Sequence, residues 1–213
     1  DQSAIYGTPN ACTACHEEKT DQWAAEKIVQ WYGEERAYHF SDDLLPGSML
    51  EQEERLPPLI RLLEDSTQPE IARATAAHYL GEMPNELAFD ALASATKSDQ
   101  ALIRYHAALS LGNWPFAQWS ASVLPLLTDP IRAVRIAAAS MVHRAGGKEQ
   151  LPSSWLGAYE AASQENMDQL LLNADFSLGV LKLADHYLQA NETEQAVQMY
   201  RRALDKDKSM NYA

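Results

Sequence analysis

The stretch that decides the fold is Gln100-Ala101-Leu102-Ile103-Arg104-Tyr105-His106-Ala107-Ala108, because the chain contains two more versions of it. One version precedes it, at Pro69-Glu70-Ile71-Ala72-Arg73-Ala74-Thr75-Ala76-Ala77, and one follows it, at Arg132-Ala133-Val134-Arg135-Ile136-Ala137-Ala138-Ala139. Each version carries an arginine at the same place, and these arginines are 31 residues apart: Arg73, Arg104 and Arg135. Repetition at such a period is typical of stacked helical hairpins.

Each repeating unit reads as two helices, with an acidic turn residue ahead of the arginine. These turn residues are Asp65, Asp99 and Asp129, and a leucine-rich or alanine-rich helix precedes each of them. The pattern resembles the HEAT repeat, and three units cover about 56–146. The resemblance implies a ladder of arginine and aspartate between neighbouring units. It also implies close approach of adjacent helices at the small alanine positions.

After Gly146-Gly147 the pattern changes, and a helix is expected over roughly 153–172. The residues beyond it resemble the tetratricopeptide repeat, with Asn191-Glu192 at the turn between two helices. The spacing that carries this resemblance is that of Val180, Leu183, Ala184, Tyr187, Ala196, Tyr200 and Ala203. Two positions depart from that family: Ala184 replaces its usual glycine and Lys208 its usual proline. Asn211-Tyr212-Ala213 would begin a further unit, so we expect this part to be truncated.

These patterns predict an all-α protein. We expect an α-solenoid (an α-α superhelix) of HEAT-like and then TPR-like helical hairpins, with an N-terminal haem-motif segment. The predicted parts are a haem segment with one helix and a loop at 1–50, HEAT-like repeats at 51–150 and a TPR-like repeat at 151–213. Within the first part, an extended leader precedes a helix that Thr20 caps and Gly33 ends.

The N-terminal segment contains Cys12-Thr13-Ala14-Cys15-His16, which has the CxxCH spacing of c-type haem attachment. By this motif, Cys12 and Cys15 form the two haem thioethers and His16 is the proximal iron ligand. Three other interpretations stay open: half of a zinc site, a thioredoxin-like redox pair, and a pair of unmodified thiols. No recognisable hydrolytic triad, phosphate loop or paired-carboxylate site is present, so we predict no catalytic residues.

A wider set of residues around the motif resembles a family of bacterial multihaem c-type cytochromes that carry HEAT-like and tetratricopeptide repeats. These residues are Tyr6-Gly7, Pro9-Asn10-Ala11, Asp21, Trp23-Ala24, Trp31-Tyr32-Gly33 and His39-Phe40. The resemblance implies bound haem c, electron transfer and a periplasmic location. Because further CxxCH motifs usually precede this one in that family, we expect additional sequence upstream of Asp1, and haem need not be bound to this chain.

His39 is the first candidate for the sixth iron ligand, since a short loop after the first predicted helix would return the chain over the haem. The alternatives are that His39 is an ordinary surface residue, that Met49 binds the iron, or that the ligand comes from upstream sequence. His78, His106 and His143 lie on the second helices of successive units and read as packing residues. Trp23, Trp31 and Tyr32 contact either the porphyrin or, more simply, the first repeat.

The composition narrows the partners of this chain. Its 17 Lys and Arg against 30 Asp and Glu leave a net charge of −13, which disfavours nucleic acid. No run of about 18 apolar residues is present, so no membrane span is expected. We therefore predict a periplasmic c-type cytochrome fragment in electron transfer, with the repeats docking other proteins, possible redox partners among them. The alternatives are a HEAT/TPR interaction scaffold without haem and a haem-dependent oxidoreductase.

Overall fold

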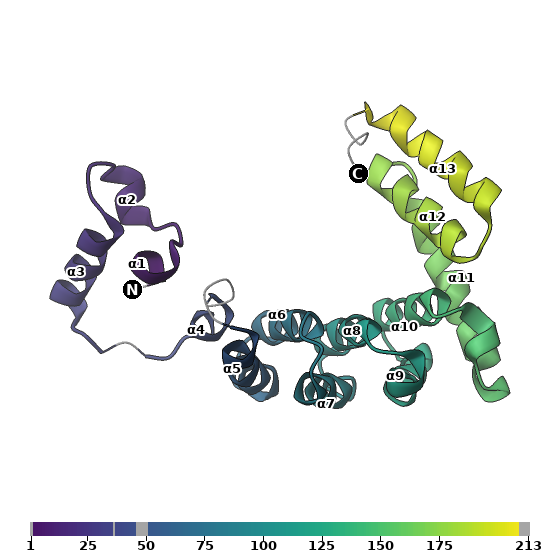
Figure 1. Ribbon diagram of the computed structural model, residues 1–213, viewed down its shortest axis with the longest axis horizontal. Helices are drawn as coiled ribbons and strands as arrows, with labels where there is room; N and C mark the ends of the chain where they lie inside the picture. The colour runs from purple at the N-terminus through teal and green to yellow at the C-terminus, as the bar shows by residue number, and fades with distance from the viewer. Residues whose placement is uncertain (1, 36, 46–50, 209–213) are drawn as a thin grey trace.

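The protein is built from α-helices that pack against one another in chain order, as its computed structural model shows (Figure 1). The structure describes residues 2–35, 37–45 and 51–208, and these ranges contain no β-strand. The predicted all-α class is therefore confirmed. No helix within the described ranges is both long and apolar enough to cross a membrane.

The middle of the chain forms three helical hairpins. They are α5 (Gln52–Glu64) with α6 (Glu70–Gly81), α7 (Glu86–Ala95) with α8 (Ala101–Ser110), and α9 (Phe116–Val123) with α10 (Arg132–Arg144). Figure 1 shows α5, α7 and α9 in one row and α6, α8 and α10 in a second row. A 3-10 turn, η3 (Leu124–Thr128), follows α9, because Pro125 lacks the N–H that an α-helix would use there.

Small side chains let the helices of the second row approach one another closely. Nine of their alanines are at most 2% exposed: Ala72, Ala74, Ala76, Ala77, Ala107, Ala108, Ala137, Ala138 and Ala139. At Gly81 of α6, a Cβ atom would lie only 2.7 Å from the Cβ of Ser110 at the end of α8. The row therefore depends on residues without bulk at the contact, as the repeated alanines predicted.

An arginine–carboxylate ladder joins successive hairpins. Arg104 donates from Nε and Nη2 to the two carboxylate oxygens of Asp129, at 2.7 and 2.9 Å, and from Nη1 to the carbonyls of Ser98 and Asp99. The Asp129 side chain is 5% exposed. Burial alone would raise its pKa, but bonds from Arg104 and Ile131 and the nearby arginine charges outweigh burial, so the pKa lies below its ordinary value.

The ladder continues at its C-terminal end but not at its N-terminal end. Arg135 donates to both carboxylate oxygens of Glu165 at 2.9 and 2.6 Å, and to the carbonyl oxygen of Asp129 at 2.8 Å. Glu165 was not predicted as a partner, because it lies outside the repeated pattern. Arg73 instead donates to the carbonyl oxygen of Leu63 at 3.0 Å. The predicted arginine–aspartate pairing is thus present at Arg104–Asp129 alone among the three described arginines.

The C-terminal part begins with short 3-10 turns, η4 (Gly147–Gln150) and η5 (Ser153–Trp155), and contains three helices. These are α11 (Leu156–Asn173), α12 (Ser177–Gln189) and α13 (Thr193–Lys206). Asn191 turns the chain between α12 and α13 with a φ of 60°, as predicted. Val180, Leu183 and Ala203 form a small core there, separate from the long core that runs from Leu56 to Ala162. Asn211-Tyr212-Ala213 lies outside the described residues.

The N-terminal part is more helical than predicted. Its helices are α1 (Gln2–Tyr6), α2 (Ala11–Cys15), α3 (Asp21–Tyr32) and α4 (Ser41–Leu44). The expected extended leader is wrong, because Asn10 caps α2 and starts a helical turn at the cysteine motif. Thr20 caps α3, and Gly33 ends it with a φ of 88°, as predicted.

The first helices also bury less than predicted. Trp31 and Tyr32 are 63% and 77% exposed, so their expected burial against the first repeat is wrong. The contacts to the repeats run through α4, which packs on α5 and α6, while α2 and α3 lie to one side (Figure 1). The prediction placed these aromatics on one helical face but could not tell which surface that face meets.

We expect Asp129→Asn to lower the free energy of unfolding by about 3 kcal/mol at pH 7, because Arg104 would lose a buried charged partner. Folding lowers the pKa of Asp129. The stabilisation by its ionised carboxylate is therefore fully present above the ordinary aspartate pKa, and it is lost as pH falls through the lower pKa that Asp129 has in the folded protein. Urea unfolding from pH 7 to pH 3 measures it. Asp90→Asn, at an exposed position on α7, is the control, and equal effects of the two variants would contradict the ladder.

Two glycine substitutions should have opposite effects on stability. A Cβ at Gly179 would lie 1.8 Å from the carbonyl oxygen of Asn173, so Gly179→Ala forces α11 and α12 apart and lowers the melting temperature. A Cβ at Gly157 meets nothing within 4 Å, so Gly157→Ala should stabilise α11 by about 0.5–1 kcal/mol. Thermal unfolding followed by circular dichroism measures both. A stable Gly179→Ala variant would show that the two helices are not in close contact.

Candidate functional site

The two cysteines lie on one face of α2. Cys12 and Cys15 are three residues apart, which is close to one helical turn, so their side chains project to the same side. Both thiols are free, with Cys12 partly exposed and Cys15 exposed. The pair therefore presents two sulfur atoms on one accessible surface, as attachment to a single large group requires.

Polar contacts hold α2 against the start of α3. The Asn10 side chain accepts from the Thr13 backbone N–H at 2.9 Å and donates to an oxygen of Asp21 at 2.5 Å. The Thr13 hydroxyl donates to the same Asp21 oxygen at 3.1 Å. Asp21 also lies in the first turn of α3, where a carboxylate is favoured by the helix dipole. One carboxylate thus fixes the position of the cysteine helix.

His16 follows α2 directly and terminates it. Its backbone N–H donates to the Cys12 carbonyl at 2.8 Å, which closes the last turn. Its imidazole is exposed and meets the indole of Trp23 edge to face, with ring centroids 5.3 Å apart. The structure therefore brings the three predicted residues Cys12, Cys15 and His16 together on one short element.

His39 lies on a different part of the chain, just before α4. Its Nδ1 is 2.7 Å from the Ser41 hydroxyl and accepts from the Ser41 backbone N–H at 3.3 Å. This pattern favours a proton on Nε2, so binding iron through Nε2 would require the other tautomer. α4 packs on α5 and α6 and accepts hydrogen bonds from Gln2 of α1 at Ser41 and Asp42, whereas α2 packs on α3 (Figure 1). The His39 ligand stays a prediction, and Met49 lies outside the described residues.

The N-terminal segment has too little core of its own, and this shortage fits a bound haem. Within residues 2–35 the buried residues are Ser3, Ala24 and Ala25. A segment of this size usually needs a disulfide, a metal or a partner to fold, and its two thiols are free. Large apolar side chains are left uncovered along α3, the helix that packs on α2: Ile28, Val29, Trp31 and Tyr32. Two thiols, an imidazole and uncovered apolar surface are the groups that hold and shield a porphyrin.

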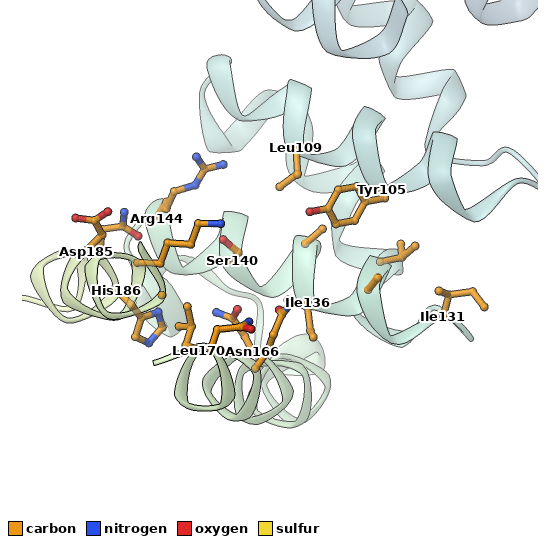
Figure 2. Close-up of a pocket in the computed structure, with 18 of the residues that line it drawn as sticks. Tyr105, Leu109, Ile131, Ile136, Ser140, Arg144, Asn166, Leu170, Asp185 and His186 are labelled. Carbon is orange, nitrogen blue, oxygen red and sulfur yellow. The ribbon is translucent and has the colours of Figure 1, made fainter. Parts of the chain in front are cut away.

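A second feature is a groove of about 610 Å³ between α8, α10, α11 and α12. Figure 2 shows Tyr105, Ile131 and Ile136 toward one end of it, and Arg144 and Asp185 toward the other. The groove thus has an apolar end and a charged end. Sequence reasoning missed it, because its walls come from α8 and α10 of the hairpins and from α11 and α12 of the C-terminal part, whose relative placement no periodicity predicts.

Two histidines stack where α10 meets α12, beside the charged end of the groove. The imidazoles of His143 and His186 are 3.9 Å apart and nearly parallel, and His143 Nε2 donates to the His186 carbonyl oxygen at 2.9 Å. Burial, with the charge of His143 adding to it, lowers the pKa of His186 to about 4. His186 is therefore neutral at pH 7, and the predicted packing role of His143 is confirmed.

The other predicted packing histidines lie on the second row. His78 is exposed, with its Nε2 3.8 Å from Glu82, while His106 is partly buried and its pKa is lowered by burial and by the charge of His78. Among the described residues, no three His, Cys, Asp or Glu side chains gather in a way that could hold a metal ion by themselves.

The sequence matches no family model, and no curated protein matches it either.

The histidine stack should make stability fall in mild acid. Folding lowers the pKa of His186. The stabilisation of the folded protein by the neutral His186 side chain is therefore complete above the ordinary histidine pKa of about 6.5, and it is lost as pH falls toward 4. Allowing for solvent screening, we expect the loss to be about 1–2 kcal/mol. Urea unfolding at several pH values should show that the free energy of unfolding falls less with decreasing pH in His186→Phe than in the wild type. Phenylalanine keeps a ring in the stack but cannot be protonated. His78→Phe is the control, and identical profiles for wild type and His186→Phe would contradict the effect.

Proposed function

We propose that this chain is part of a c-type cytochrome that binds haem covalently through Cys12 and Cys15 and transfers electrons. The observation that carries the proposal is the placement of both thiols on one face of α2, with His16 directly after them. Each thiol would add across one vinyl group of the porphyrin, and the His16 imidazole would bind the iron. When bound, haem supplies an iron that accepts and releases one electron.

Several residues of the chain would support that role. Asp21, Asn10 and Thr13 hold the cysteine helix in place, so both sulfur positions are set before attachment. Trp23 lies against the His16 ring and restricts its rotation. The exposed Trp31 and Tyr32 offer apolar surface that would exclude water from the haem edge, which in turn tunes the reduction potential.

Electron transfer is the favoured role because the sequence carries no recognisable hydrolytic triad, phosphate loop or paired-carboxylate site beside the haem motif. A sixth ligand such as His39 would occupy the position where an oxidoreductase binds its substrate. We further propose that the chain belongs to the multihaem cytochromes with HEAT-like and TPR-like repeats and acts in the periplasm. The parts would be a haem segment at 1–50, HEAT-like repeats at 51–150 and a TPR-like repeat at 151–213.

The repeats are proposed to form an α-solenoid that docks other proteins. Two observations favour this role: the hairpins stack in two rows (Figure 1), and a groove opens between α8, α10, α11 and α12. Solenoids present extended concave surfaces to partners. The same observations support the second candidate function, an interaction scaffold that acts without bound haem.

Covalent attachment is tested by producing the chain in a bacterial periplasm together with the haem-attachment machinery. We expect an absorbance band near that of c-type haem that survives denaturation and acid-acetone extraction, with a mass increase of one haem. Cys12→Ala/Cys15→Ala should abolish the retained haem, because no sulfur atom remains to bond the porphyrin. Asn10→Ala should reduce the yield of attached haem, since α2 loses its cap.

A known c-type cytochrome matured in the same cells controls for the machinery. If it acquires haem while this chain does not, the cytochrome proposal fails and the scaffold without haem is favoured. His16→Ala should keep the attached haem but change the spectrum, since the proximal ligand is lost. His39→Ala should convert a six-coordinate spectrum to a five-coordinate one. An unchanged spectrum in His39→Ala would place the sixth ligand elsewhere.

A further inference from the structure

We propose that the groove between α8, α10, α11 and α12 binds an extended peptide segment in which apolar residues lie next to a carboxylate group. This inference rests on the docking role proposed for the repeats and does not depend on haem attachment. The groove volume of about 610 Å³ lies in the range of ligand-binding cavities. Its lining changes from apolar side chains at one end to charged side chains at the other, so a ligand with both kinds of group would bind in one direction (Figure 2).

A row of amide side chains lines the wall formed by α11. Asn166, Gln169 and Asn173 all face the groove, at spacings of three and four residues that place them on one side of the helix. Each amide offers both a donor and an acceptor, which are the two groups that a peptide bond also presents. A row of amides along a wall therefore matches a peptide backbone better than it matches an acyl chain, which has polar atoms at one end only.

Asn166 is the most buried of the three amides on this wall. It is 8% exposed, and no described residue forms a hydrogen bond with its side chain. Because no fully enclosed side-chain polar atom in the described residues lacks a partner, the Asn166 amide keeps its access to the groove. A peptide in the groove can therefore exchange hydrogen bonds with this amide.

The charged end of the groove favours an anion. Arg144 of α10 and Lys182 of α12 both line it, and neither forms an ion pair with a described residue. The Arg144 guanidinium lies over Gly112, where a Cβ would be 2.9 Å from Nη2, so a larger residue there would displace it. In a chain of net charge −13, two unpaired cations on one surface are a local attraction for a carboxylate.

One carboxylate of the protein opposes this attraction. Asp185 lies at the same end of the groove (Figure 2) and accepts a hydrogen bond from the Tyr200 hydroxyl at 2.6 Å. The Tyr200 bond holds Asp185 toward α13 and away from a full pairing with the cations. Removing the charge of Asp185 should therefore strengthen the binding of an acidic ligand.

The other end of the groove is suited to apolar side chains. Tyr105 and Leu109 of α8 face Ile136 of α10 across it, and Ile131 at its edge is 44% exposed (Figure 2). Burial of this surface by a ligand is favourable, at about 25 cal/mol per Å² of apolar area. The peptide would thus lie with its apolar residues on α8 and its carboxylate between α10 and α12.

The test uses the full chain carrying Cys12→Ala/Cys15→Ala, so that a failure of haem attachment cannot affect it. The probes are fluorescein-labelled pentapeptides with three varied apolar residues followed by Asp-Glu, and a matched set ending in Lys-Lys, measured by fluorescence anisotropy. We expect the best acidic probes to bind about tenfold more tightly than their basic counterparts. Increasing the salt concentration should weaken the binding.

Variants of the groove locate the binding. Arg144→Glu/Lys182→Glu should weaken the best acidic probe at least about tenfold, and Asn166→Leu should weaken it several-fold. Asp185→Asn should tighten it. The matched control is Lys97→Glu/Arg201→Glu, which makes the same charge change at exposed sites outside the groove. Melting temperatures confirm that each variant is folded.

Three outcomes would overturn the proposal. The first is that no acidic probe binds more tightly than about 1 mM. The second is that the acidic and basic sets bind equally. The third is that the groove variant and its surface control lose affinity to the same extent, since the charge at the groove would then have no special role.

Discussion

The bidentate bond between Arg104 and Asp129 is the interaction on which the rest of the structure depends. It joins the second hairpin to the third at a place where the carboxylate is almost fully buried. Asp129 then offers its carbonyl oxygen to Arg135, and Arg135 bonds Glu165 of α11. One connected set of charged groups therefore sets the stacking of the hairpins and carries it over into the C-terminal part. The groove exists because α11 and α12 are held beside α8 and α10 in this way.

The N-terminal part follows a different principle. Its helices are specified locally, by caps at Asn10 and Thr20 and by the glycine at 33. It buries three residues between 2 and 35, so tertiary contacts contribute little to its stability. Exposed aromatic side chains on α3 and two free thiols on α2 are what such a segment would have if a cofactor formed its core. The helices from α5 to α11 share a continuous core and need no such addition, which explains why two different architectures can coexist in one chain.

The two candidate sites also differ in how their residues are gathered. Cys12, Cys15 and His16 are close together because they are close in the sequence. Tyr105, Arg144, Asn166 and Lys182 come from four helices, and each is unremarkable on its own helix. The stacked pair of His143 and His186 sits at the same junction and brings together side chains 43 residues apart. Sites of this second kind depend on the angle at which the two sets of hairpins meet.

The sequence by itself determined the all-α class, the 31-residue spacing of Arg73, Arg104 and Arg135, the caps at Thr20 and Gly33, and the composition of the CxxCH motif. These properties follow from local periodicity, turn chemistry and residue spacing, which act over a few residues. Only the tertiary structure decided that Arg135 pairs with Glu165, that Trp31 and Tyr32 are exposed, and that His143 stacks on His186. It also decided where the groove forms. These outcomes depend on which surfaces of distant helices meet, and that choice is made by packing between segments that no local pattern relates.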